Sequence, residues 1–239
     1  MPIMLDRKSL RRDIINDGLT LYQIKNGLLF GTDALQLADF ICAEHMGTYK
    51  NAVELGTGSG VIALLLAQRK KISVTYAVEI QEIYSELARY NVEVNNMTDR
   101  INIICADLKD GVNFSDLNLP AYSMDMVFTN PPYIKYTNDV GKSGMLSELD
   151  HKNIARREIM CTIDDVVKSA ARYLKNGGDF YTVYRPDRFQ SLFTAMVSRN
   201  ITPKKIAFVY ANKSFNASLV LIKGKQGAGE GLTVRNIFI

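Results

Sequence analysis

Residues 51–60 read NAVELGTGSG, and the apolar stretch VIALLLAQR follows directly at 61–69. The first part predicts a short buried strand over residues 52–55, and the second predicts a helix. The glycines between them let the backbone turn sharply and approach a ligand beside the unpaired N–H groups of the helix. Their G-x-G-x-G spacing departs from the G-x-G-x-x-G of dinucleotide sites. The order of strand, glycine turn and helix predicts an α/β fold.

Polar side chains come at the ends of the apolar runs that we expect to form the next strands. Glu79, Asp107 and Asn130 each follow such a run, and Glu54 lies just before the glycine turn. The carboxyl ends of parallel strands meet at one edge of a sheet, so these side chains should converge on one crevice. Glu79 is well placed to accept hydrogen bonds from both hydroxyls of a ribose. The alternative for Glu79 is an ordinary surface glutamate.

The last of these strand ends, residues 130–133, reads NPPY. Neither proline can donate to a sheet ladder and each restricts the residue before it, so the strand should stop at Asn130. The elbow offers the amide of Asn130, the backbone carbonyl of Pro131 and the ring of Tyr133. Two acceptors and an aromatic face can hold a planar –NH2 group. On these four residues alone, a turn that merely ends a strand is an equal alternative.

The remaining pattern predicts one domain over residues 1–239, with an N-terminal arm and a hairpin at about 1–32. The hairpin is predicted from Asn26-Gly27, which lies between apolar runs at 19–24 and 28–30. Thr32 and Asp33 are suited to cap a helix over 34–46. Helices are also expected over 82–94 and 154–174. Further strands are expected over 179–184, 205–210 and 217–222, the last two as an antiparallel pair at the edge of the sheet.

Composition sets limits on the class of protein. The chain is 47% hydrophobic and 23% charged, and no apolar run reaches the ~18 residues that span a bilayer. Three widely spaced cysteines and two histidines argue against disulfides and metal sites, and indicate a cytoplasmic protein. A net charge of +4 permits a nucleic-acid partner without requiring one.

The glycine turn, the acidic strand ends at Glu79 and Asp107, and the NPPY elbow together resemble the S-adenosylmethionine-dependent amino-methyltransferases. Three further stretches, FGTDA at 30–34, ARREI at 155–159 and YRPDR at 184–188, are similar to the bacterial family that methylates N6 of adenine 37 in tRNA-Val. The resemblance implies a Rossmann-like class I methyltransferase fold. That fold has a seven-stranded, mainly parallel sheet with an antiparallel edge strand and helices on both faces.

The resemblance also implies how S-adenosylmethionine is held. The glycine turn would fold round the methionine part, with Glu54 near its amino group, and Glu79 would hold the ribose. Asp107 and the backbone of Leu108 would bind the adenine of the cofactor. The residues expected to bind the cofactor are Thr32, Asp33, Glu54, Gly56, Thr57, Gly58, Gly60, Glu79, Ile80, Asp107, Leu108 and Asn130.

By the same resemblance, the catalytic elbow comprises Asn130, Pro131, Pro132 and Tyr133. Asn130 and the Pro131 carbonyl would hold the two hydrogens of an adenine amine, so that its lone pair faces the methyl group. The adenine would have to be flipped out of a tRNA loop. The phosphate contacts that offset this cost are expected from Arg156, Arg157, Arg185 and Arg188. A monomer is favoured, with no metal and no membrane partner.

Other hypotheses for the function keep the same active site but assign it a different substrate. Enzymes that methylate a glutamine side-chain amide in release factors share the NPPY elbow, because that amide offers a similar –NH2 group. They usually carry a helical domain ahead of the glycine turn, whereas only 52 residues precede Val53 here. Methylation of adenine N6 in ribosomal RNA or DNA is a further alternative. A non-catalytic RNA-binding module is the least favoured.

Overall fold

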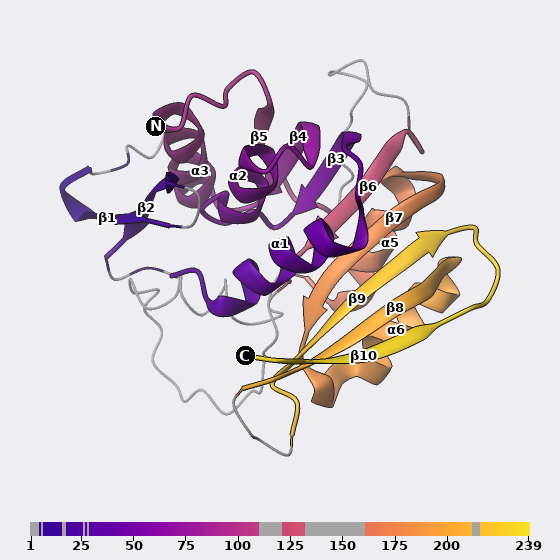
Figure 1. Ribbon diagram of the computed structural model, residues 1–239. Coiled ribbons are helices and arrows are strands. Elements are labelled where there is room, and N and C mark those ends of the chain that lie inside the picture. The colour runs from indigo at the N-terminus through magenta and orange to yellow at the C-terminus, as the bar shows by residue number, and fades with distance from the viewer. Residues whose placement is uncertain are drawn as a thin grey trace, which may run out of the picture.

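The computed structural model describes residues 5, 7–15, 18–25, 27, 29–109, 121–131, 161–211 and 216–239. Within them, a single large sheet of eight strands runs through the centre of the molecule (Figure 1). Its strands lie side by side in the order β10 (Thr233–Phe238), β8 (Ile201–Tyr210), β9 (Leu219–Gln226), β7 (Leu174–Tyr184), β6 (Met124–Thr129), β3 (Tyr49–Leu55), β4 (Ile72–Glu79) and β5 (Ile101–Cys105).

The sheet is mainly parallel, as the sequence predicts. All strands except β9 run in the same direction, and β9 pairs antiparallel with both β7 and β8. Two details of the prediction are wrong: the sheet has eight strands rather than seven, and the antiparallel strand lies inside it. The additional strand β10 covers the edge beside β8. Its side chains are almost all exposed, so it lacks the apolar periodicity by which the other strands were predicted.

Helices cover both faces of the sheet (Figure 1). One face carries α1 (Thr32–Glu44), α2 (Val61–Gln68) and α3 (Glu82–Val94), and the other carries α5 (Ile163–Tyr173) and α6 (Phe189–Ser198). Two short 3-10 helices, η1 (Arg7–Ser9) and η4 (Pro186–Arg188), complete the described elements. Met126 and Phe128 of β6 pack on the α1–α2 side and Val127 on the α5–α6 side, as expected for a strand buried on both faces. No helix in the described ranges is both long and apolar enough to cross a bilayer.

The N-terminal hairpin exists, but with a different partner strand from the predicted one. β2 (Thr20–Ile24) pairs antiparallel with β1 (Leu10–Ile14), which lies in the stretch expected to be an N-terminal arm. Residues 29 and 30 form no strand, and residues 26 and 28 lie outside the described part of the chain. The sequence of β1, LRRDI, has only two apolar side chains, so it resembled a polar arm more than a strand.

Two asparagines attach the hairpin to α3. Asn91 and Asn95, one helical turn apart, each exchange two hydrogen bonds with the backbone of β2. Asn91 bonds to the N–H and carbonyl of Tyr22 (2.7 and 2.9 Å), and Asn95 to those of Thr20 (3.0 and 2.7 Å). Four residues of helix rise ~6 Å and two residues of strand ~7 Å, so the two amides match alternate residues of β2. The two asparagine side chains thus pair with backbone N–H and carbonyl groups at the open edge of β2.

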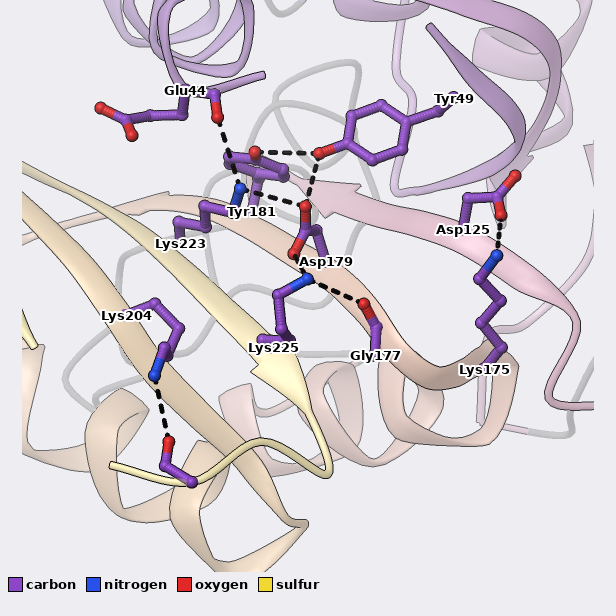
Figure 2. A network of polar contacts seen from close by, with 11 residues as sticks. Glu44, Tyr49, Asp125, Lys175, Gly177, Asp179, Tyr181, Lys204, Lys223 and Lys225 are labelled. Carbon is purple, nitrogen blue, oxygen red and sulfur yellow. Dashed lines mark hydrogen bonds and ion pairs between the residues drawn. The ribbon is translucent and has the colours of Figure 1, made fainter. Parts of the chain in front are cut away.

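A polar network lies at the edge of the sheet where the parallel strands begin (Figure 2). Asp179 accepts a hydrogen bond from the hydroxyl of Tyr49 at 2.6 Å and lies 3.0 Å from Lys223 Nζ and 2.9 Å from Lys225 Nζ. The hydroxyls of Tyr49 and Tyr181 are 3.0 Å apart. These contacts join β3, β7 and β9 at this edge.

Candidate active site

The glycine turn joins the end of β3 to the start of α2. Gly56, Gly58 and Gly60 have φ angles of +74°, +56° and +82°, a region that residues with a Cβ rarely adopt. The N–H groups of Gly56 and Thr57 donate to the carbonyl of Val78 at 2.9 and 3.0 Å. These bonds hold the turn against the end of β4.

Glu79 is the last residue of β4, and its side chain lies under the glycine turn. Its Oε2 accepts the N–H of Gly58 and its Oε1 accepts the N–H of Gln81, both at 2.9 Å. Burial raises the pKa of Glu79, although the backbone N–H bonds oppose the shift. Each carboxylate oxygen has a second lone pair, so Glu79 can accept further hydrogen bonds from a ligand.

A small pocket opens beside Glu79 at the carboxyl edge of the sheet. It is lined by Gly56, Val78, Glu79, Ile80, Ala106, Asp107, Leu108 and Cys161. Five of these eight belong to the predicted cofactor set. Asp107 Oδ1 accepts the N–H of Lys109 at 2.9 Å, and Lys109 Nζ lies 3.6 Å from its other oxygen. The ends of β3, β4 and β5 therefore meet at one pocket, and two of the four predicted polar strand ends, Glu79 and Asp107, lie in its lining.

Glu54 lies behind the glycine turn and is 1% exposed. Its Oε2 accepts a hydrogen bond from the hydroxyl of Thr57 at 2.6 Å. Burial raises the pKa of Glu54 to about 8, because a charged carboxylate loses its hydration there. The buried side chain of Thr57 thus links Glu54 to the glycine turn.

Asn130 lies at the end of β6, beside the glycine turn. The hydroxyl of Thr129 donates to the carbonyl of Leu55 at 2.8 Å, which ties the end of β6 to the end of β3. Asn130 is half-buried and Pro131 is buried. Pro132 and Tyr133, the other two residues of the predicted elbow, lie outside the described residues.

Asp33 reaches this elbow from the first turn of α1. Its Oδ2 accepts a hydrogen bond from Asn130 Nδ2 at 3.1 Å, and its Oδ1 accepts the N–H of Ala34 at 2.9 Å. The prediction that Thr32 or Asp33 caps this helix is wrong, because Gly31 occupies the N-cap position and both residues lie within the first turn. Thr32 is exposed. Asp33 and Asn130 meet although 97 residues separate them.

The side chains of Glu54 and Glu79 have similar surroundings. Both are buried, and the hydrogen bonds that hold them come from backbone N–H groups and a hydroxyl. A buried carboxylate held by neutral donors attracts an organic cation strongly when that cation excludes water. In the described ranges, no group of three or more His, Cys, Asp or Glu side chains is arranged to hold a metal ion.

A family model described as the methyltransferase small domain matches residues 24–145, which are 122 of the 239 residues. The chain belongs to this family. The matched segment includes the glycine turn, Glu79, Asp107 and the NPPY elbow, so it contains every strand end from which the site was predicted.

Individual relatives of this methyltransferase differ in how much of the chain they match. A tRNA1(Val) (adenine(37)-N6)-methyltransferase from Phocaeicola vulgatus is 29% identical over 209 residues, which cover 86% of this chain and 80% of that protein. A release factor glutamine methyltransferase from Rhodopirellula baltica is 34% identical over 82 residues, which cover 34% of this chain and 26% of that protein. A crystal structure of a predicted O-methyltransferase from Agrobacterium tumefaciens superposes with a TM-score of 0.64 and 20% identity, covering 87% of this chain and 86% of that one. This likeness confirms the Rossmann-like methyltransferase fold.

The predicted RNA-binding arginines of this methyltransferase divide into two groups. Arg185 and Arg188 directly follow β7, whose end lies beside that of β6. Arg185 forms an exposed ion pair with Asp187 (2.9 Å), and the Arg188 guanidinium lies 5.6 Å from the ring centre of Tyr184. Arg156 and Arg157 lie outside the described residues.

Three residues near the site of this methyltransferase were not predicted. Asn91 is fully buried and donates to the carbonyl of Ser59 at 2.9 Å, so the contact that holds the hairpin also holds the glycine turn. An asparagine on the buried face of a helix has poor helix propensity, which is the signal that could have marked it. Gln23 Oε1 accepts the N–H of Phe30 at 3.0 Å and so fixes the approach to α1. Cys161 lines the pocket but lies far from the other motifs, and a lone cysteine gives no pattern to read.

Proposed function

We propose that this methyltransferase transfers a methyl group from S-adenosylmethionine to the exocyclic N6 amine of an adenine in tRNA, at position 37 of the anticodon loop of tRNA-Val. The observation that carries the proposal is the placement of Asn130 and Pro131 at the end of β6, which is tied to the end of β3 just before the glycine turn. The named activity of the relative from Phocaeicola vulgatus, which matches most of the chain, supports the choice of substrate.

The donor set of the pocket fits S-adenosylmethionine. Glu79 would accept the ribose hydroxyls, and Asp107 with the backbone of Leu108 would bind the adenine. The glycine turn would enclose the methionine part, with Glu54 near its ammonium group. When bound, the cofactor supplies a methyl group on a positively charged sulfur. Glu54 and Glu79, held by neutral donors, would stabilise such a cation.

The elbow would act by positioning the acceptor amine. An adenine amine is a poor nucleophile because its lone pair is delocalised into the ring. Asn130 Oδ1 and the Pro131 carbonyl would accept its two hydrogens and direct the lone pair towards the methyl group. The same two oxygens would stabilise the positive charge that develops on nitrogen. By resemblance, Tyr133 would stack on the base and Pro132 would keep the elbow rigid.

The target adenine would have to leave the stack of its loop to reach Asn130. Turning a base out costs about a few kcal/mol, and least in single-stranded loops. Arg185 and Arg188, beside the end of β6, would offset part of that cost by contacting phosphates. We expect Arg156 and Arg157 to contribute in the same way. We also expect a monomer of one domain that acts in the cytoplasm.

The partial match to a release factor glutamine methyltransferase favours one second candidate, methylation of a glutamine amide in a release factor. Incubation with radiolabelled S-adenosylmethionine and either total tRNA or a purified release factor separates the two. We expect label in tRNA. Label in the release factor with none in RNA would contradict the tRNA assignment and support the second candidate.

A further inference from the structure

We propose that Asp33 is a positioning residue for methyl transfer: its carboxylate fixes which end of the Asn130 amide faces the amine. The inference rests on the proposed function, because it concerns how the same amide holds its substrate. Asp33 Oδ2 accepts from Asn130 Nδ2 at 3.1 Å, and Asp33 Oδ1 accepts from the N–H of Ala34 at 2.9 Å. One carboxylate thus joins the first turn of α1 to the end of β6.

The orientation of the Asn130 amide matters because its two ends have opposite chemistry. The oxygen end accepts hydrogen bonds and the –NH2 end donates them, while the two ends differ little in size. A carboxylate can only accept, so the –NH2 end of Asn130 must face Asp33. The oxygen end then points away from Asp33, in the orientation that can accept a hydrogen from an amine. In the reversed orientation, the –NH2 group of Asn130 would face the –NH2 group of the substrate, and neither could accept a hydrogen bond from the other.

Asp33 is itself held firmly enough to impose this choice. It lies in the first turn of α1, and Leu37 and Ile41 of that helix are fully buried in the core. The far end of the helix is fixed as well, because Glu44 lies 2.6 Å from Lys205 Nζ and 3.0 Å from Arg235 Nη2. A carboxylate on a rigid helix holds a neighbouring amide in one orientation better than one on a loop would.

This role differs from the one that the resemblance implies for Asp33, which is to bind the cofactor. A residue that binds the cofactor should lower cofactor affinity when it is replaced. A residue that orients Asn130 should lower kcat and leave the dissociation constant of the cofactor unchanged. Replacing Asp33 should therefore change the dissociation constant of the cofactor if Asp33 binds the cofactor, and kcat if Asp33 orients Asn130.

The test compares Asp33→Ala with Asp33→Asn in single-turnover methyl transfer to tRNA. With alanine, the hydrogen bond from Asp33 no longer fixes the orientation of the Asn130 amide, and we expect a loss of about 2- to 5-fold. With asparagine, the new side chain can still accept from Ala34 N–H and then presents its –NH2 group to Asn130. This stabilises the reversed amide, and we expect a loss of about 100-fold. The milder chemical change should thus have the larger effect, whereas a merely structural role predicts the opposite order.

Asp39→Asn is the matched control, because Asp39 lies on the same helix, is half exposed and pairs with Arg69. We expect it to leave transfer unchanged. Equal losses for the two Asp33 variants, a larger loss for alanine, or a fall in cofactor affinity that matches the fall in rate would each overturn the inference.

A second measurement does not depend on activity. In a two-dimensional ¹⁵N–¹H spectrum of asparagine-labelled protein, the Asn130 side-chain signals are assigned by their absence in Asn130→Ala. We expect them to shift in Asp33→Ala, and unchanged signals would rule out the hydrogen bond. If the wild-type protein methylates no tRNA, the proposed function fails, and this spectrum still decides whether Asp33 orients Asn130.

Discussion

The carboxyl groups at the two edges of the sheet have different hydrogen-bond partners. Where the parallel strands begin, Asp179 lies between Lys223 and Lys225, and Asp125 bonds to Lys175 (Figure 2). Where the strands end, Glu54 and Glu79 accept hydrogen bonds from backbone N–H groups and a hydroxyl.

The pKa values follow this difference. Burial alone would raise the pKa of all four carboxyl groups. At the first edge, hydrogen bonds and nearby lysines overcome that effect and lower the pKa of Asp125 and Asp179. At the second edge, the effect of burial prevails and the pKa of Glu54 and Glu79 is raised. The ion pairs at the first edge therefore stabilise the fold. At the second edge, the raised pKa values favour neutral carboxyl groups, and a cationic ligand would favour their charged form.

The largest expected effect comes from the edge where the strands end. We expect Asn130→Ala to lower the rate of methyl transfer by about 100- to 1,000-fold, because the developing charge loses an acceptor fixed in place. The dissociation constant of S-adenosylmethionine, measured by titration calorimetry, should stay nearly the same. Asn102→Ala, at an exposed position of β5, is the control and should change neither. Equal losses of rate and cofactor affinity would show that Asn130 is structural.

At the other edge, Asp179→Asn should lower the free energy of unfolding by about 2 kcal/mol and leave cofactor affinity unchanged. Breaking a fully buried ion pair costs about 3–5 kcal/mol. Lys225 is 37% exposed, so water screens part of the loss. Urea unfolding measures the change. Asp164→Asn, which removes an exposed ion pair with Arg199, should change stability by less than about 0.5 kcal/mol.

Acid should reduce the contribution of Asp179 to the free energy of unfolding. The folded-state pKa of Asp179 is lowered, so its contribution to stability is present above the unfolded pKa of about 3.9 and is lost as pH falls through the folded value. The stability difference between the wild-type protein and Asp179→Asn should therefore shrink on acidification. A difference that stays constant from pH 7 to pH 3 would contradict the role of Asp179 as a charged partner.

A smaller effect is expected from Glu54, whose pKa is about 8 before a cation binds. A cationic cofactor favours the charged carboxylate, so cofactor affinity should rise by up to about 10-fold between about pH 7 and pH 8 and then level off. Glu54→Gln should flatten this dependence, with the titration of the cofactor itself common to both proteins. Calorimetry in buffers of different ionisation enthalpy should also detect proton release in the wild-type protein alone. The same pH dependence in both proteins would contradict the proposal.

Much of the site could be predicted because its residues stand at the ends of apolar runs. Glu54, Glu79, Asp107 and Asn130 each lie at or next to the carboxyl end of a strand, and the parallel sheet brings those ends together. The pairing of Asp33 with Asn130 could not be predicted, because 97 residues separate them and contacts made through the folded core leave no local pattern.

The same limit applies to other parts of the fold. Tyr49 and Asp179 bond across 130 residues, and neither lies in a recognisable motif. β1 and β10 were missed because their exposed, mixed side chains hide the period of two that marks a buried strand. The sequence was thus most informative where one face is buried or a strand ends in a polar group.

The central claim is that the edge where the strands end holds an exocyclic amine for methylation. Nucleoside analysis by mass spectrometry tests it most directly, after the protein has acted on unmodified tRNA-Val and the product has been digested at neutral pH. We predict one N6-methyladenosine per tRNA, located in the anticodon-loop fragment and absent with Asn130→Ala. Methylation at a ring nitrogen, such as N1 of adenine, would contradict the account, because a ring nitrogen has no pair of hydrogens for Asn130 and Pro131 to accept.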